Sequence, residues 1–346
     1  RQMCIRDREG AGPGEDSSTR GFWLSITDES VEQGYLSSLG YRDGEALAER
    51  LQALKTKGVY QRLSSRGKEL MDSLMPGIIE QASGLDDPDE AITRLINVIS
   101  AIAPREVYLA LLVESESARE QLAKLCSASS WVTEVITKNP ALLDELIDPR
   151  HLYVAPSREQ LNIELTPVLV DLDEHDVEMQ MERLRRFKQA QQLRVAAADI
   201  MQTMPLMRVS DHLTWIAEAM VNVSLELAWD YLVGRHGYPM YELEGERKRA
   251  EFGVFGFGKL GGIELGYGSD LDLVFVHNSQ GDAQVTDGDR SIDNTTFFTR
   301  LGQRLVHLLS TLTPSGVLYE VDTRLRPNGK SGLLVSSLAA FESYEL

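Results

Sequence analysis

The sequence predicts an α+β protein: a mainly helical N-terminal part followed by a domain with a small mixed sheet. From about residue 28 to 240, apolar residues recur at helical spacing between polar turns. After Gly237-Tyr238-Pro239 the composition changes, and runs of β-branched and aromatic residues flank a glycine-rich loop. We therefore expect a helical region over 21–240 and a compact catalytic core over 241–346.

The helical part is predicted element by element from its apolar stripes. Residues 91–113 are apolar around Pro104, which indicates two helices that meet near Ala103. Such stripes usually mark core packing, so this part of the chain is expected to be a scaffold. Further helices are predicted over 141–147, over 178–201 and after a cap at Ser210-Asp211.

The second part reads as strand, strand, helix and strand. The first two strands are expected at 252–257 and 271–277, with the glycine-rich loop between them. The helix over 295–312, capped by Asn294 or Thr295, has a continuous apolar face with Arg300 and His307 opposite. A last strand is expected from Val317 to Arg326.

Composition limits the classes of function. A chain of 346 residues is long enough for two or three compact units. The 53 acidic and 35 basic residues give a net charge of -18, which repels phosphate backbones, so we expect no nucleic-acid partner. With only two cysteines a disulfide framework is excluded, and we expect a cytoplasmic protein. The sequence has no apolar run long enough to cross a membrane, so we expect no membrane partner.

Both ends of the chain have unusual features. Residues 1–20 combine glycine, proline, serine and charge without periodicity, so we expect a disordered or non-native tail. The last residues carry no helix-ending signal, so the 241–346 core is expected to be truncated at its C-terminus.

The glycine-rich loop is the first feature that carries chemistry. It contains Gly256, Gly258, Lys259, Gly261 and Gly262 directly after a predicted strand. Glycines allow backbone amides to approach phosphate oxygens, and the lysine adds a point charge. The alternative is an ordinary turn, and the pattern does not match a P-loop.

An acidic pair follows the loop. Ser269 precedes Asp270 and Asp272, which open the second strand. Side chains alternate along a strand, so the two carboxylates are expected on one face, close enough to share a hard cation. No Lys or Arg lies between Gly261 and Val285 to neutralise them. The alternative is a solvated turn at a strand edge.

A row of charges on the last strand is the third feature. Alternation is expected to place Glu320, Asp322, Arg324 and Arg326 on one face. One acid completing a metal site, beside arginines that hold a polyphosphate, explains this row. The alternatives are an exposed face with cross-strand ion pairs and, for the acidic pair, a glycosyltransferase metal site.

These motifs together resemble the DNA polymerase β-type nucleotidyltransferase fold. The segments from Gly256 to Phe275 and from Tyr319 to Pro327 look more narrowly like bacterial glutamine synthetase adenylyltransferase. Two upstream strings, Phe187-Lys-Gln-Ala-Gln and Ser210-Asp-His-Leu-Thr-Trp, are similar too. The loop around Glu264 looks more like the C-terminal, adenylylating module of that family.

The resemblance implies a site and a reaction. Asp270, Asp272 and Asp322 would be the catalytic metal ligands for two Mg²⁺ ions, with Glu320 as the other candidate for the third ligand. ATP would be the substrate, and AMP would pass to a tyrosine of glutamine synthetase, with a PII-type signalling protein as a second partner. The nucleotide would be held by Gly258, Lys259, Gly261, Gly262, Ser269, Arg324 and Arg326.

Two other functions remain open at this point. The chain could be the deadenylylating, phosphorolytic module of the same family, which uses the same metal site. It could instead be a non-catalytic regulatory module that binds nucleotide.

Overall fold

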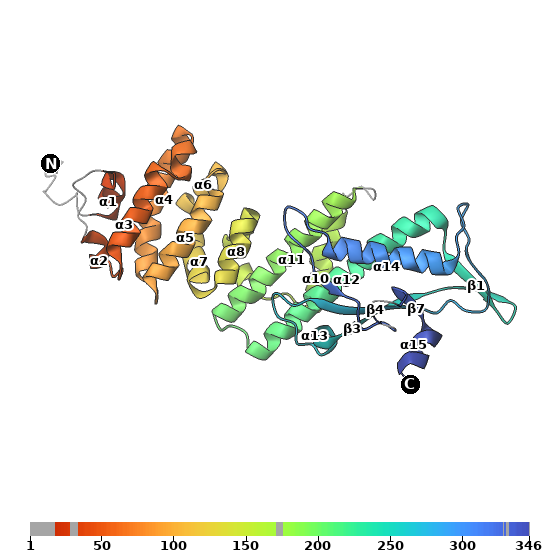
Figure 1. The fold of residues 1–346 in the computed structure, drawn as a ribbon. Helices are drawn as coiled ribbons and strands as arrows, with labels where there is room; N and C mark the ends of the chain where they lie inside the picture. Colours follow the sequence, from red (N-terminus) through yellow and green to blue (C-terminus); the bar gives the residue numbers. More distant parts are fainter. Residues whose placement is uncertain (1–17, 28–33, 171–175, 328, 330–331, 346) are drawn as a thin grey trace, which may run out of the picture. The chain divides into compact units, whose positions relative to one another are not determined.

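A computed structural model of the chain describes residues 18–27, 34–170, 176–327, 329 and 332–345 (Figure 1). The chain divides into two compact units, Arg1–Pro149 and Arg150–Leu346. The predicted tail lies outside the described residues as far as residue 17, and the first helix begins at Thr19.

The described part of the first unit is helical. The predicted break near Ala103 is confirmed, because one helix ends at Ile102 and the next begins at Glu106. The predicted helix over 141–147 is a 3-10 helix, η3. In chain order the elements are α1 (Thr19–Ser25), α2 (Tyr35–Ser38), α3 (Gly44–Thr56), η2 (Val59–Arg62), α4 (Ser65–Ser83), α5 (Pro88–Ile102), α6 (Glu106–Glu114), α7 (Glu116–Ala128), α8 (Ser130–Lys138) and η3 (Pro140–Leu146), and α9 (Pro149–Leu152) spans the boundary.

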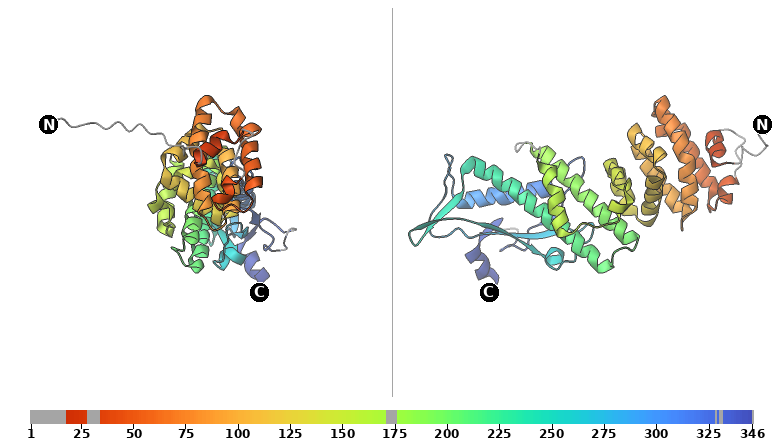
Figure 2. Two further views of the ribbon diagram at one scale, coloured as in Figure 1. Left: turned by 90° about the vertical axis from the view of Figure 1, so that its left-hand side faces the viewer. Right: turned by 180° about the vertical axis from the view of Figure 1, so that it is seen from behind.

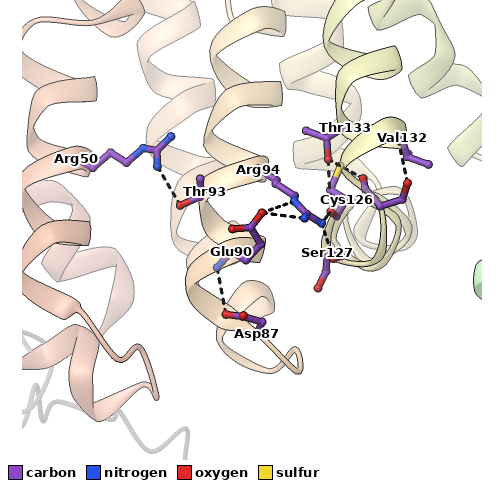
Figure 3. A network of polar contacts seen from close by, with 10 residues as sticks. Arg50, Asp87, Glu90, Thr93, Arg94, Cys126, Ser127, Val132 and Thr133 are labelled. Carbon is purple, nitrogen blue, oxygen red and sulfur yellow. Dashed lines mark hydrogen bonds and ion pairs between the residues drawn. The ribbon is translucent and has the colours of Figure 1, made fainter.

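Arg94 on α5 ties this helix to the end of α7 (Figure 3). Its Nη1 donates to the carbonyl oxygens of Cys126 and Ser127 at 2.9 and 2.7 Å. Carbonyls in the last turn of a helix lack intrahelical donors, so Arg94 supplies the missing bonds. Burial raises the pKa of the Cys126 thiol to about 12, and a buried thiol of this kind is a packing residue rather than a nucleophile.

The second unit combines long helices with two small sheets. Its helices are α10 (Arg158–Leu169), α11 (Val177–Ile200), α12 (Leu206–His236), α13 (Gly258–Gly261), α14 (Asn294–Ser310) and α15 (Leu338–Glu345). Its strands are β1 (Pro239–Leu243), β2 (Glu246–Arg249), β3 (Phe252–Phe257), β4 (Leu271–His277), β5 (Asp282–Thr286), β6 (Val321–Asp322) and β7 (Val335–Ser337).

Strand β4 is the centre of the main sheet. β3 pairs with it antiparallel, whereas β6 and β7 pair parallel with its beginning and its end. The other sheet is antiparallel, in the order β2-β1-β5. The predicted α+β class with a small mixed sheet is therefore confirmed.

Helices cover the main sheet on both faces. Phe252 of β3 stacks on Phe275 of β4 and on Phe298 of α14, with ring centres 5.8 and 5.9 Å apart. On the opposite face Phe255 stacks on Phe341 of α15. Figures 1 and 2 show α12 and α14 over one face and α15 beyond the other.

One hydrophobic cluster joins α10, α11, α12 and α14 to β4. The composition change after Pro239 therefore marks a change of secondary structure inside the second unit, since helices before it and strands after it share this core.

Three predicted boundaries are wrong. The cap of α14 is Asp293, whose Oδ1 accepts from the Thr296 amide at 2.8 Å, and not Asn294 or Thr295. Ser210 lies inside α12, which begins four residues earlier, directly after Pro205. The last predicted strand is reduced to the two residues of β6, because the chain turns after Asp322.

No helix in the described part of the chain has both the length and the apolar character that a membrane crossing requires.

Candidate active site

Asp272 stands at the centre of the site because β4 has neighbours on both sides. In the sheet register it lies opposite Phe257, the last residue of β3, and opposite Asp322 of β6. Gly258, which follows Phe257, therefore borders Asp272 on one side, and the carboxylate of Asp322 borders it on the other. Asp270 lies just before the strand, which begins at Leu271.

The glycine loop makes a close backbone approach to Asp272. Gly258 has φ +54°, in the left-handed region, and a Cβ there would lie 2.2 Å from Asp272 Oδ2. A Cβ on Gly261 would lie 2.6 Å from the carbonyl oxygen of Gly256. Glycine is thus required at both positions for steric reasons.

The loop after β3 is a single helical turn. α13 runs from Gly258 to Gly261, and the amide of Gly262 donates to the carbonyl of Gly258 at 2.9 Å. Lys259 is exposed on this turn, and its charge acts on the Asp272 carboxylate.

Asp322 is held by the turn that follows it. Its Oδ1 accepts from the amide of Arg324 at 2.8 Å, two residues on, which is an Asx turn. The Arg324 guanidinium also binds Oδ2, through Nε at 2.6 Å and through Nη2. This pairing raises the pKa of Arg324, whose side chain is exposed.

An open pocket of about 570 Å³ lies beside these residues. Strand alternation does not extend through Arg326 as predicted, yet the pocket still brings the four charged residues of that row together with Asp270. Its lining is Asp270, Glu320, Val321, Asp322, Thr323, Arg324 and Arg326.

Two residues predicted to bind nucleotide are held by local contacts. Arg326 Nη1 donates to the carbonyl and the hydroxyl of Thr323 at 2.6 and 2.7 Å. The Ser269 hydroxyl accepts from the amide of Gly266 at 3.0 Å and so closes the turn before Asp270.

The acidic residues repel one another. The pKa of Asp272 is raised, first by partial burial and then by the charges of Asp270 and Asp322, while Arg324 and Lys259 act in the opposite direction. A bound cation relieves this kind of repulsion. The structure therefore concentrates negative charge at the start of β4.

The donor set fits a hard cation, since carboxylate oxygens are the ligands that Mg²⁺ prefers. Within the described ranges, no three Asp, Glu, His or Cys side chains are arranged as they stand to hold a metal ion. Both carboxylate oxygens of Asp322 accept from Arg324, Oδ1 from its amide and Oδ2 from its guanidinium, so Arg324 neutralises part of the negative charge at this position.

Sequence reasoning missed the supports that α11 provides for the segment between α14 and β6. Arg185 is fully buried and donates to the carbonyls of Gly316 and Leu308 at 2.8 and 3.2 Å. Lys188 donates to the carbonyl of Leu318, and its Nζ lies 4.0 Å from the centre of the Tyr319 ring. The sequence held one signal for these supports. Arg185 and Lys188 lie on the apolar stripe of α11, and charged residues on a buried face require polar partners.

Known proteins similar to this chain share most of its length. Residues 119–346 match the family model described as glutamate-ammonia ligase adenylyltransferase. A protein of Thioalkalivibrio sulfidiphilus named bifunctional glutamine synthetase adenylyltransferase/adenylyl-removing enzyme is 49% identical over 334 residues, 96% of this chain and 34% of that protein. Proteins of the same name from Pseudomonas aeruginosa and Shewanella loihica are 44% and 45% identical, over 98% and 94% of this chain and 35% and 34% of their own length.

The chain thus spans about a third of the length of the curated relatives it matches. The family match covers both the helices from α8 onward and the sheet that carries the acidic residues. The chain belongs to the glutamate-ammonia ligase adenylyltransferase family.

Proposed function

We propose that this chain is a Mg²⁺-dependent nucleotidyltransferase that transfers AMP from ATP to a tyrosine of glutamine synthetase. The observation that carries the proposal is the position of Asp272, which borders the glycine loop on one side and Asp322 on the other. A glycine loop suits phosphate, and paired carboxylates suit the cation that accompanies it. The names of the relatives supply the protein substrate.

We assign the metal ligands to Asp270, Asp272 and Asp322. The register favours Asp322 over Glu320 as the third, because Asp322 lies opposite Asp272 in the sheet. When bound, the metal would supply charge stabilisation at the phosphorus under attack. Residues 241–346 hold all of these groups, and we propose them as the catalytic core.

The other residues of the site would position the nucleotide. The loop that begins at Gly258 brings backbone within reach of phosphate oxygens, and Lys259 adds a positive charge next to it. Arg324, which holds Asp322 in this structure, would turn to a phosphate oxygen when a cation takes its place. Gly261, Gly262, Ser269 and Arg326 complete the proposed nucleotide contacts.

Substitution of the acidic pair tests the function. Asp270→Asn or Asp272→Asn should abolish the transfer of labelled AMP from ATP to glutamine synthetase, because each removes a ligand charge. Asp282→Asn is the matched control, since it removes an exposed charge on β5 of the same unit. Transfer that persists in the two site variants would contradict the proposal.

Removal of AMP by phosphate, the deadenylylating reaction, is the second candidate, because the names of the relatives carry an adenylyl-removing activity as well. This reaction predicts release of ADP when the chain is incubated with adenylylated glutamine synthetase and phosphate.

The family resemblance also suggests a PII-type signalling protein as a partner, which co-sedimentation with the purified signalling protein would test.

A further inference from the structure

A groove rich in arginine lies between the end of α12, the 288–290 loop and the outer face of α14. Two adjoining pockets of about 1030 and 540 Å³ form it, and they share Tyr231, Arg235 and Arg304. We call it the arginine groove after the four arginines that line it, which are Arg235, Arg290, Arg300 and Arg304. None of its lining residues belongs to the pocket at Asp270.

The groove is positive in a chain of net charge -18. Among the described residues, none of the four arginines forms a salt bridge. Asp230 and Asp289 also line the groove, but no ion pair in the described part of the chain joins either of them to these arginines. The four guanidinium groups are thus available to an anionic ligand.

Arg304 is positioned before any ligand arrives. Its guanidinium carbon lies 3.5 Å from the centre of the Tyr231 ring, a cation–π contact. Its Nε is buried without a hydrogen-bond partner, and burial lowers the pKa of the group. A half-buried guanidinium without an ion-pair partner is costly, and a ligand carboxylate at its terminal nitrogens would offset part of this cost.

His236 positions two more of the arginines. It is 5% exposed, and its Nδ1 donates to the carbonyl of Arg290 at 2.7 Å. Its Nε2 is then free to accept from Arg300 Nη1, which lies 3.4 Å away. The loop and the helix on the two sides of the groove are therefore joined through one buried imidazole.

The spacing along α14 suits an extended peptide. Arg300 and Arg304 are four residues apart, which is roughly 6 Å along a helix at about 1.5 Å per residue. Alternate side chains of an extended chain are about 6.8 Å apart and point to one face. Acidic residues at alternate positions of a peptide would therefore reach both arginines, whose planar groups bind carboxylates with two bonds.

We propose that the arginine groove binds an extended acidic segment of the protein substrate. Asp230 and Asp289 on its walls would repel a continuous row of phosphates, whereas a peptide with alternate acids places uncharged atoms between its charges. That the acidic segment belongs to the protein substrate rests on the proposed function. That the groove binds an acidic segment does not.

Peptide binding tests the groove directly. The full chain is titrated, at low salt, into a fluorescent ten-residue peptide of alternating Glu and Ser, and anisotropy is followed. Arg300→Gln/Arg304→Gln should weaken binding about fivefold or more, the effect expected for the loss of two ion pairs. The matched control is Arg158→Gln/Arg208→Gln, which removes two exposed charges of the same unit outside the groove and should bind as the wild type does.

Three results separate the outcomes. Equal binding by the wild type and the groove variant would overturn the proposal. The affinity for tripolyphosphate is the second measurement. If tripolyphosphate binds more tightly than the peptide and binds less tightly to the groove variant, the groove is a phosphate site and the proposal is overturned.

In the third measurement, the KM for glutamine synthetase in AMP transfer should rise in the groove variant while kcat is unchanged. An unchanged KM, with peptide binding lost, would show that the segment is not on the protein substrate. If the wild type transfers no AMP, the proposed function fails, while the peptide titration still decides whether the groove binds an acidic segment.

Discussion

At the scale of single residues, the site depends on how closely the backbone of the glycine loop approaches β4. Gly258 has both a positive φ and no room for a Cβ, since Asp272 Oδ2 would lie 2.2 Å from it. A side chain there would displace a carboxylate that the proposed chemistry needs. The glycine is thus part of the geometry of the acidic pair.

Gly258→Ala is therefore expected to reduce AMP transfer by about tenfold or more, because Asp272 must move. Its free energy of unfolding should fall by only about 1 kcal/mol, the cost of a left-handed alanine. Gly268→Ala is the control, since a Cβ there meets nothing within 4 Å. Urea unfolding and labelled-AMP transfer measure the two effects, and equal transfer by both variants would contradict the steric argument.

Lys188 predicts a pH dependence of stability. Burial, together with the charge of Arg185, lowers its pKa from 10.5 to about 8 in the folded protein. Between these values the unfolded chain binds more protons than the folded chain, so the contribution of Lys188 to stability rises with pH. Below about pH 8 both states are protonated, and the contribution stays at its lower value.

Lys188→Met removes the titrating group. The difference in free energy of unfolding, wild type minus variant, should therefore grow by on the order of 1 kcal/mol between about pH 7 and pH 9.5. Urea titrations at several pH values measure it. A difference that stays constant would show that the folded ammonium keeps an ordinary pKa.

At the scale of elements, α11 fixes the segment that leads from α14 to β6. Arg185 binds carbonyls at the end of α14 and in the turn after it, and Glu182 accepts from the Thr313 hydroxyl at 2.8 Å. The last carbonyls of α14 have no intrahelical donors, so a buried guanidinium both bonds them and complements the helix dipole.

Arg185→Leu is accordingly expected to lower the free energy of unfolding by about 3 kcal/mol, because several buried carbonyls lose their donor. Arg186→Leu changes the neighbouring, exposed arginine, whose 3.4 Å pair with Glu182 is worth little. Chemical denaturation of the two variants compares them. Similar losses in both would mean that Arg185 does not brace this segment.

The sequence predicted the elements better than their ends. The two helices around Ala103, the strands on either side of the glycine loop and the exposed positions of Arg300 and His307 follow from apolar periodicity, which burial enforces. The short β6 does not follow, because the turn depends on a side-chain bond from Asp322 to the amide of Arg324. Local bonds of this kind compete with strand pairing and leave no periodic signal.

The candidate site shows the same division. The chemistry of a shared metal site suggested that the acidic pair and the charged row from Glu320 to Arg326 act together, and one pocket brings Asp270 beside that row. Spacing could not predict that Arg324 binds Asp322 or that α11 supports the preceding turn. Those contacts join residues more than a hundred positions apart, as between Arg185 and Gly316, or depend on a bend of the chain.

At the scale of the whole molecule, the described helices and strands divide between two compact units, apart from α9, which spans the boundary. In the second unit the core is continuous across the change of composition near residue 240. Trp229 of α12 makes an edge contact with Phe297 of α14, with ring centres 5.6 Å apart, and Phe298 of the same helix packs toward the sheet. α14 is therefore covered by the sheet on one side and by α12 on another.

This shared core predicts how the chain can be divided. A fragment of residues 150–346 should unfold in one cooperative transition, because it contains the whole hydrophobic cluster. A fragment of residues 241–346 should not, because without α12 it exposes the face of α14 that carries Phe297, and exposed apolar area costs about 25 cal/mol per Å².

Circular dichroism and urea unfolding of the two fragments make the comparison. A sharp transition in the shorter fragment would show that the proposed catalytic core is held by its sheet and α14 alone. A sharp transition in the longer fragment only would show that α10, α11 and α12 are needed to fold the site, so that substitutions in these helices would affect AMP transfer without contacting nucleotide.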